Sequence, residues 1–212
     1  DYATSQIRNI ALFAHGGAGK TSLAEAMLYV AKASNRLGKV EDGTTVLDHG
    51  ADEIHRKITI TLGLAQFEWK DVKINLLDTP GYADFVGEVC SALRAVDAAV
   101  LVLRAAAGVE VGTELVWERI HDHRIPTLVV VNMMDREHAD FQKCVQSAHD
   151  RLGANVVPVQ LPIGAAETFK GVIDLLHMKA FITQGKGVDA KDVEQEIPAD
   201  MQAAAQAARN VL

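Results

Sequence analysis

A glycine-rich run near the N-terminus combines small residues with a lysine and a threonine, in the order Ala14-His15-Gly16-Gly17-Ala18-Gly19-Lys20-Thr21. It follows the apolar residues 10–13 and precedes residues 23–33, whose apolar spacing is typical of a helix. Small residues allow backbone N–H groups to surround phosphate oxygens, Lys20 adds a cation, and the Thr21 hydroxyl is a ligand for Mg²⁺. The run therefore predicts a phosphate-binding loop. Its first position is Ala14 instead of the usual glycine, and an ordinary glycine-rich turn is the alternative.

Two more polar clusters directly follow predicted strands, the first with alternating apolar residues and the second apolar. Asp78-Thr79-Pro80-Gly81 comes after residues 72–77, and Asn132-Met133-Met134-Asp135 comes after residues 126–131. Ligands of open α/β sheets bind at the carboxyl ends of the strands, so we expect both clusters to lie beside the phosphate loop. Asp78 can hold Mg²⁺ through water, and the N–H of Gly81 can meet a γ phosphate. Taken alone, the first cluster also fits a Pro-Gly turn and the second a polar turn.

Asn132 and Asp135 have the chemistry to recognise a base. A carboxylate accepts hydrogen bonds from two adjacent N–H donors, and guanine offers such a pair whereas adenine does not. Each charge-assisted bond contributes roughly 1.5–3 kcal/mol, so guanine should be favoured by about 10²-fold.

Thr59 lies just after a long polar connection, residues 34–57. A loop of this length inside a compact domain is usually functional or mobile. Thr59 could complete the Mg²⁺ ligands when a γ phosphate is present and so order the loop. A β-branched strand residue is the alternative.

The remaining pattern predicts an α/β fold in which a mostly parallel sheet has helices on both faces. Strands are expected at 7–14, 58–69, 72–77, 98–103 and 126–131, and helices at 21–33, 85–96, 112–122 and 141–152. The second and third strands flank the turn Lys70-Asp71, which predicts an antiparallel hairpin. After Gly153 we expect short strands at 156–161, 169–175 and 178–183, a turn at 184–189, and an alanine-rich helix with Pro198 in its first turn.

Composition limits the classes of partner. The 212 residues carry a formal net charge of −7, which argues against a broad basic face and against direct DNA binding. The longest candidate for a membrane span, residues 95–103, is broken by Asp97 and is shorter than the ~20 residues that span a bilayer, so no membrane association is expected. Cys90 and Cys144 lack the spacing of a metal site and are interpreted as buried thiols in a reducing compartment. These features predict a cytoplasmic protein.

Together the motifs resemble those of the translational GTPases, and within them elongation factor G and its paralogues. The phosphate loop and residues 78–85 and 132–136 resemble the family's nucleotide motifs, and residues 40–45 and 56–61 resemble its first switch. Residues 152–175 and 197–201 contain stretches that resemble the subdomain inserted in the nucleotide domain of elongation factor G. The resemblance implies a phosphate-loop GTPase fold, Mg²⁺-dependent binding of GTP and GDP, hydrolysis of GTP, and action on the ribosome by a monomer.

The resemblance also implies a division of the chain and a set of site residues. Residues 1–155 are expected to form a GTP-binding domain without its last strand and helix, and residues 156–212 part of the inserted α+β subdomain. The residues expected in catalysis are Lys20, Gly81 and Tyr82. The residues expected to ligate Mg²⁺ are Thr21, Thr59 and Asp78. The residues expected to contact the nucleotide are Ala14, His15, Gly16, Gly17, Ala18, Gly19, Lys20, Thr21, Ser22, Asp78, Gly81, Asn132, Met133 and Asp135.

Five positions depart from the family pattern. Tyr82 replaces the histidine that helps to position the attacking water, and a phenol does not exchange protons near neutrality as an imidazole does. Met133 replaces the lysine after the base-reading asparagine. Gly16 and Gly17 replace an apolar residue and an aspartate, and Lys57 replaces a glycine. We therefore expect slow or differently triggered hydrolysis and weaker nucleotide binding.

Three functions are compatible with these residues. The first is an elongation factor G-like GTPase. The second is a switch module of the same fold that binds GTP with little or no turnover, which Tyr82 and Met133 favour. The third is an unrelated phosphate-loop ATPase or small-molecule kinase, against which Asn132 and Asp135 argue.

Overall fold

The computed structural model describes residues 2–185, 187 and 190–212, and the chain divides into two compact units. The first unit consists of Asp1–Leu103 and Val109–Asn132, and the second of Arg104–Gly108 and Met133–Leu212. Each unit is described by itself.

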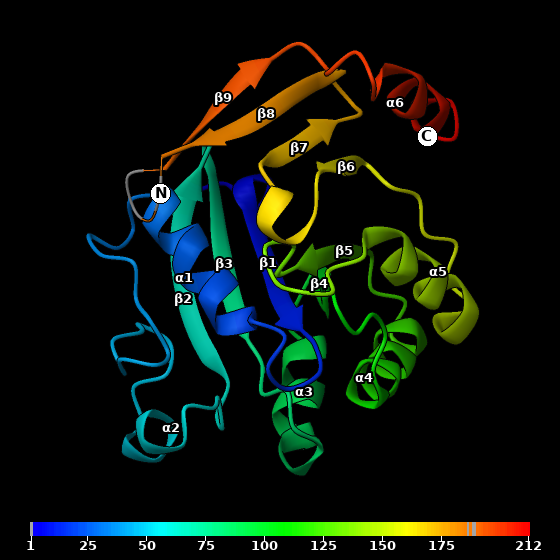
Figure 1. Ribbon diagram of the computed structural model, residues 1–212. Helices are drawn as coiled ribbons and strands as arrows, with labels where there is room; N and C mark the ends of the chain where they lie inside the picture. The colour runs from blue at the N-terminus through cyan, green and yellow to red at the C-terminus, as the bar shows by residue number, and fades with distance from the viewer. Residues whose placement is uncertain (1, 186, 188–189) are drawn as a thin grey trace. The chain divides into compact units, whose positions relative to one another are not determined.

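Within the described residues of the first unit, five strands form one sheet in the order β2-β3-β1-β4-β5 (Figure 1). β1 (Ile7–Phe13) is central and pairs in parallel with β3 (Val72–Asp78) and β4 (Ala98–Arg104). β2 (Gly63–Trp69) is antiparallel to β3, and β5 (Thr127–Asn132) lies beside β4. The parallel neighbours bring the carboxyl ends of β1, β3 and β4 to the same edge of the sheet.

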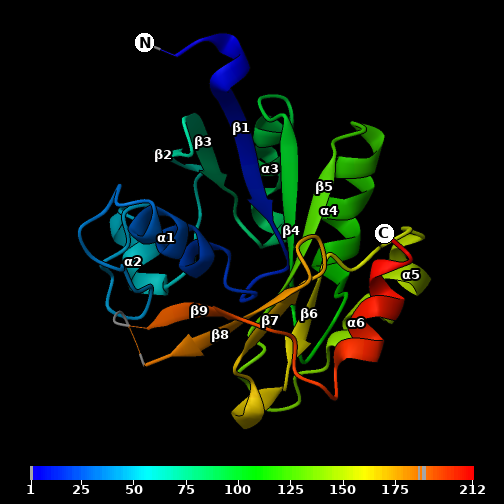
Figure 2. The same ribbon diagram turned by 90° about the horizontal axis from the view of Figure 1, so that it is seen from above.

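Helices cover both faces of this sheet (Figure 2). In β1, Ile10 and Leu12 pack in one cluster with Ala24 and Leu28 of α1 (Lys20–Val30). Because side chains alternate along a strand, the buried Phe13 faces the other way, where α3 (Val86–Leu93) contacts β1 and α4 (Val111–Asp122) contacts α3. The α/β class with a mostly parallel sheet is confirmed.

The hairpin of β2 and β3 is confirmed, and its turn residues Lys70 and Asp71 both have positive φ, 48° and 63°. The predicted start of β2 at residue 58 is wrong, since the strand begins at Gly63. The reason is that the N–H groups of residues 60–62 donate to the carboxylates of Glu53 and Glu88 instead of to a neighbouring strand. The long polar connection also contains a short helix that the pattern did not indicate, α2 (Ala51–Arg56).

The second unit contains an antiparallel sheet in the order β6-β7-β8-β9. The helix predicted over 141–152 is confirmed as α5 (Phe141–Leu152), which begins after the capping residue Asp140 and is followed by Gly153 with a φ of 59°. A buried cluster that includes Ile173, Leu175 and Ala205 joins the sheet to α6. The other elements are β6 (Gln160–Ile163), β7 (Gly171–Asp174), β8 (Lys179–Gln184), β9 (Lys191–Gln195) and α6 (Gln202–Arg209).

Several expectations for this unit are corrected. The first short strand begins at Gln160 instead of 156, and β9 was not anticipated. α6 begins at Gln202 because a separate turn precedes it, in which the N–H of Met201 donates to the carbonyl of Pro198 at 2.9 Å. Pro198 therefore lies before the helix and not in its first turn. The turn expected at 184–189 falls partly on residues 186, 188 and 189, outside the described residues.

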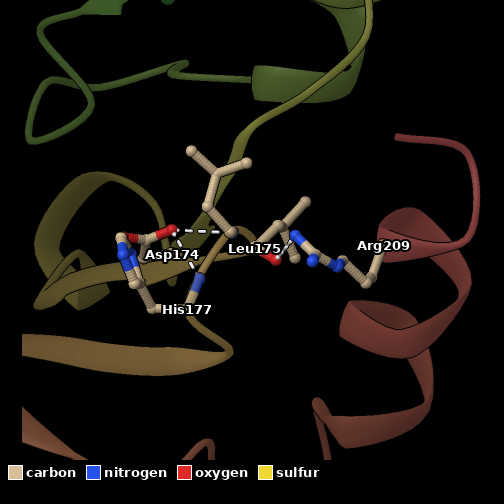
Figure 3. Close-up of polar contacts among 5 residues, drawn as sticks. Asp174, Leu175, His177 and Arg209 are labelled. Atoms are coloured by element: carbon tan, nitrogen blue, oxygen red, sulfur yellow. Dashed lines mark hydrogen bonds and ion pairs between the residues drawn. The ribbon is translucent and has the colours of Figure 1, made fainter.

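The connection between β7 and β8 is held by side chains (Figure 3). Asp174 accepts hydrogen bonds from the N–H groups of Leu176 and His177, at 2.7 and 3.2 Å, and from the His177 ring at 2.8 Å. Arg209 of α6 donates to the carbonyl of Leu175 at 2.7 Å. The turn is therefore tied both to itself and to the last helix of its unit.

Of the two cysteines, only Cys144 is buried, whereas Cys90 is partly exposed, so the expectation of two buried thiols is half wrong. In the part of the chain that the structure describes, no helix has both the length and the apolarity required to cross a membrane.

Candidate functional site

The loop between β1 and α1 turns on two glycines with left-handed backbone, Gly17 with φ 77° and Gly19 with φ 86°. Other residue types rarely adopt this conformation, so the glycines define the curve of the loop. Gly19 directly precedes α1, and its carbonyl accepts from the N–H of Leu23 at 2.9 Å. Ala14 has an ordinary φ and is buried beside Val102. A methyl group therefore fits at the position where the usual motif has glycine.

Lys20 and Gly81 lie next to each other in this site. The Lys20 side chain is buried, and a Cβ placed on Gly81 would lie 2.7 Å from its Nζ and 2.9 Å from the backbone nitrogen of Gly16. Only glycine fits such an approach. The turn after β3 is thereby brought against the phosphate loop, and the charge of Lys20 lies at the junction.

The three residues expected to ligate a metal come together. The Thr21 hydroxyl donates to Asp78 Oδ2 at 2.6 Å and lies 3.0 Å from the hydroxyl of Thr59. All three side chains are buried. Thr79, next to Asp78, donates to the carbonyl of Leu12 at 2.6 Å, which fixes the end of β3 against β1.

Two carboxylates at this point have buried oxygens without a close hydrogen-bond partner among the described residues, Asp78 at Oδ1 and Asp48 at both oxygens, although the Thr59 hydroxyl is near enough to Asp48 to lower its pKa. Burial raises the pKa of Asp78 to about 7, while the Lys20 ammonium and the Thr21 hydroxyl act in the opposite direction. Burial also raises the pKa of Asp48 and lowers that of Lys20. Buried carboxylates in proteins are usually paired with a cation or coordinate a metal, and these oxygens are therefore available as cation ligands.

Tyr82 is the residue after Gly81, and its ring lies on the phosphate loop. A Cβ placed on Gly16 would lie 2.9 Å from Cζ of the ring and 3.1 Å from each Cε atom. The ring therefore fills the space that a side chain at position 16 would need. Tyr82 is 44% exposed, so part of the ring reaches solvent.

Asn132, at the end of β5, donates from Nδ2 to the carbonyl of Ala18 at 3.0 Å and so ties this strand to the phosphate loop. Met133 and Asp135 belong to the second unit. Met133 has a φ of 62°, which turns the chain sharply after the strand. The Asp135 side chain is 67% exposed, and its Oδ2 lies 3.8 Å from Arg136 Nε.

Comparison with known proteins agrees with this geometry. Residues 5–198 match the family model of the elongation factor Tu GTP binding domain. The chain belongs to this family. It is also similar to a protein of Thermus thermophilus solved by crystallography, with 36% identity and a TM-score of 0.90 over 98% of this chain. The chain spans 30% of the length of that protein.

The donor set of this elongation factor Tu-type domain fits Mg²⁺, the cation that the family implies. Mg²⁺ takes oxygen ligands and is usually bound by one or two carboxylates together with phosphates and water. The hydroxyls of Thr21 and Thr59 and the free oxygens of Asp78 and Asp48 are all of this kind. In the described residues no group of three or more histidine, cysteine or acidic side chains forms a separate metal site.

The ring of His15 lies against the first turn of α4. A Cβ placed on Gly112 would lie 2.5 Å from its Nδ1, and its Nε2 is 3.8 Å from Glu110 Oε1. His15 therefore contributes mainly its backbone to the loop. Ser22 is exposed in the first turn of α1.

Sequence reasoning missed Asp48, which lies in the long polar connection without a spacing that sets it apart from its polar neighbours. It also missed Glu25, a fully buried acid of α1 that accepts hydrogen bonds from the N–H groups of Val46 and Leu47, at 2.7 and 3.3 Å. An acid inside the apolar pattern of a predicted helix was the available signal for Glu25, because such a residue requires buried donors.

Proposed function

We propose that the chain is the Mg²⁺-dependent GTP-binding and GTP-hydrolysing part of a translational GTPase that acts on the ribosome in the manner of elongation factor G. The observation that carries the proposal is the meeting of Thr21, Thr59 and Asp78 beside Lys20. These residues come from the phosphate loop, the long polar connection and the end of β3. Their convergence supports a site that senses the number of phosphates on a nucleotide.

In this proposal each residue near the phosphates has a defined role. Lys20 and the N–H groups of residues 14–22 bind phosphate oxygens, and the N–H of Gly81 binds the γ phosphate. Thr21 and Thr59 supply hydroxyl ligands and Asp78 a carboxylate for Mg²⁺, which when bound neutralises charge on the β and γ oxygens. The hydroxyl of Tyr82 orients the attacking water.

Recognition of the base is assigned to Asn132, Met133 and Asp135. Asp135 accepts from the two N–H donors of guanine, Asn132 links the base site to the phosphate loop, and Met133 covers a face of the base. Residues 1–155 act as the GTP-binding domain and residues 156–212 as part of the inserted subdomain. A monomer in the cytoplasm, with the ribosome as its partner and without membrane or direct DNA contacts, follows from the family resemblance.

A second candidate function is a GTP-binding switch with little or no turnover. The residue that favours it is Tyr82, because a phenol cannot take up and pass on a proton near neutral pH as the family's histidine can. Loop ordering by a γ phosphate would still operate in such a protein, since it depends on Thr59 and not on Tyr82.

Two measurements test these functions. In competition with a fluorescent GDP, unlabelled GTP should displace the probe at a concentration about 10²-fold lower than ATP. Phosphate release from GTP is then measured with and without ribosomes. Stimulation supports the hydrolase, nucleotide binding without stimulation supports the switch, and equal competition by GTP and ATP contradicts both. The variant Thr21→Ala is the control for site-specific binding.

A further inference from the structure

Glu53 is a buried residue whose carboxylate binds the backbone after Thr59 and whose backbone carbonyl binds the residue before it. It is 4% exposed, and its Oε1 accepts hydrogen bonds from the N–H groups of Ile60 and Thr61 and from the Thr61 hydroxyl, each at 3.0 Å. Before Thr59, the N–H of Ile58 donates to the backbone carbonyl of Glu53 at 3.3 Å. A single residue therefore holds both neighbours of Thr59.

The same carboxylate secures the start of α2. Its Oε2 accepts from the N–H of Gly50 at 3.0 Å. α2 has six residues, and helices this short are not stable in water without contacts of this kind. Without the carboxylate, the N–H groups of Ile60 and Thr61 would lose their acceptor, which favours rearrangement of the segment. The helix start and the position of Thr59 are thus linked through one side chain.

We infer that Glu53 positions Thr59 as a Mg²⁺ ligand and thereby sets the affinity of the domain for the triphosphate form of its nucleotide. The inference rests on the proposed function. The hydroxyl of Thr59 lies 3.0 Å from that of Thr21, so a shift of residues 58–61 changes the ligand set directly. Glu53 acts through the backbone and is a positioning residue, not a ligand. Because Thr59 contributes only when a γ phosphate is present, the diphosphate complex does not depend on Glu53.

The test compares two dissociation constants in the same protein. Glu53→Ala should weaken binding of GTPγS in the presence of Mg²⁺ about tenfold, while the dissociation constant for GDP changes by less than about twofold. The Mg²⁺ concentration for half-maximal GTPγS binding should rise in parallel. Asp52→Ala is the matched control, since Asp52 is an exposed acid in the same helix, and it should leave both constants unchanged.

Equal weakening for the two nucleotides, or no weakening for either, would overturn the inference. If Glu53→Ala does not melt cooperatively, Glu53→Met decides by the same ratio, because it keeps a side chain of similar length and removes both acceptor oxygens. Failure of the proposed function gives a different result: the parent protein then binds GTPγS no better than an ATP analogue. Failure of the inference alone leaves that parental preference intact.

Discussion

The ring of Tyr82 lies on Gly16, in the space that any side chain at position 16 would occupy. The two residues come from the phosphate loop and from the turn after β3, and both depart from the pattern of the family that the sequence resembles. Their sizes are complementary, because Gly16 has no side chain at the place where the Tyr82 ring lies. The position of the Tyr82 hydroxyl therefore depends on Gly16.

Gly16→Val is expected to displace the ring and to slow single-turnover GTP hydrolysis about tenfold, because small misplacements of a reacting group are costly. GDP affinity should change little. In a Tyr82→Ala background the same substitution should have no further effect, and an equal loss in both backgrounds would indicate a general distortion of the loop. Gly87→Ala is a suitable control, since a Cβ there meets no atom within 4 Å.

Tyr82→His is expected to raise the hydrolysis rate by about 10²-fold, because an imidazole exchanges protons near neutral pH. The comparison is a single-turnover measurement on the parent and the variant, with ribosomes present. Tyr82→Phe, which keeps the ring and removes the hydroxyl, should be slower than the parent. No gain with histidine would count against a role for this position in orienting water.

Met133→Lys is expected to tighten guanine nucleotide binding about fivefold, because in the proposed function it adds a cation at the base site, for which about 1 kcal/mol is a reasonable gain. Titration with a fluorescent GDP measures the effect. Met133→Gln has a similar length without the charge and should show no gain. If glutamine tightened binding as much as lysine, charge would not be the cause.

Lys57→Gly is expected to stabilise the fold. Lys57 follows the last residue of α2 and has a φ of 56°, a left-handed conformation that costs a residue with a side chain roughly 1–2 kcal/mol. Glycine avoids this cost, but its greater conformational freedom in the unfolded chain cancels part of the gain in stability. A net gain of about 0.5–1 kcal/mol corresponds to a Tm rise of roughly 1–4 °C. Arg56→Gly, one residue earlier and inside the helix, should lower Tm instead. A lower Tm for Lys57→Gly would contradict this account.

Cys144 is expected to resist alkylation while Cys90 reacts. Burial raises the pKa of the Cys144 thiol from 9.0 to about 11, so at pH 8 only about one molecule in a thousand carries the thiolate. The fold favours the protonated thiol, and this contribution to stability is present below pH 9 and is lost as the pH rises through 11. Mass spectrometry after iodoacetamide treatment should find one label on the folded protein and two after denaturation. Two labels on the folded protein would contradict the observed burial.

The regular part of the fold could be predicted because local patterns specify it. The central strand before Ala14, the hairpin at Lys70-Asp71 and the helix that ends at Gly153 each follow from side-chain periodicity and turn residues within a few positions. Asp78 and Asn132 themselves could likewise be located beside the phosphate loop, because each directly follows a predicted strand of the same sheet. The candidate nucleotide motifs are short and contiguous, so spacing could suggest each of them, and their shared place after predicted strands favoured a common site over separate turns.

By itself, the sequence determined the family and the order of the main elements, and it predicted the residue types for a phosphate site. Only the tertiary structure decided that residues 58–62 do not form a strand, that Glu53 holds both sides of Thr59, and that Tyr82 lies on Gly16. Each of these three features depends on hydrogen-bonding groups or on side-chain packing between residues that are distant in the sequence. The hydrogen bonds from backbone N–H groups to a buried carboxylate outweigh the preference of the β-branched residues in this segment for a strand. The carboxylate lies outside the segment, so the sequence of the segment alone could not predict this outcome.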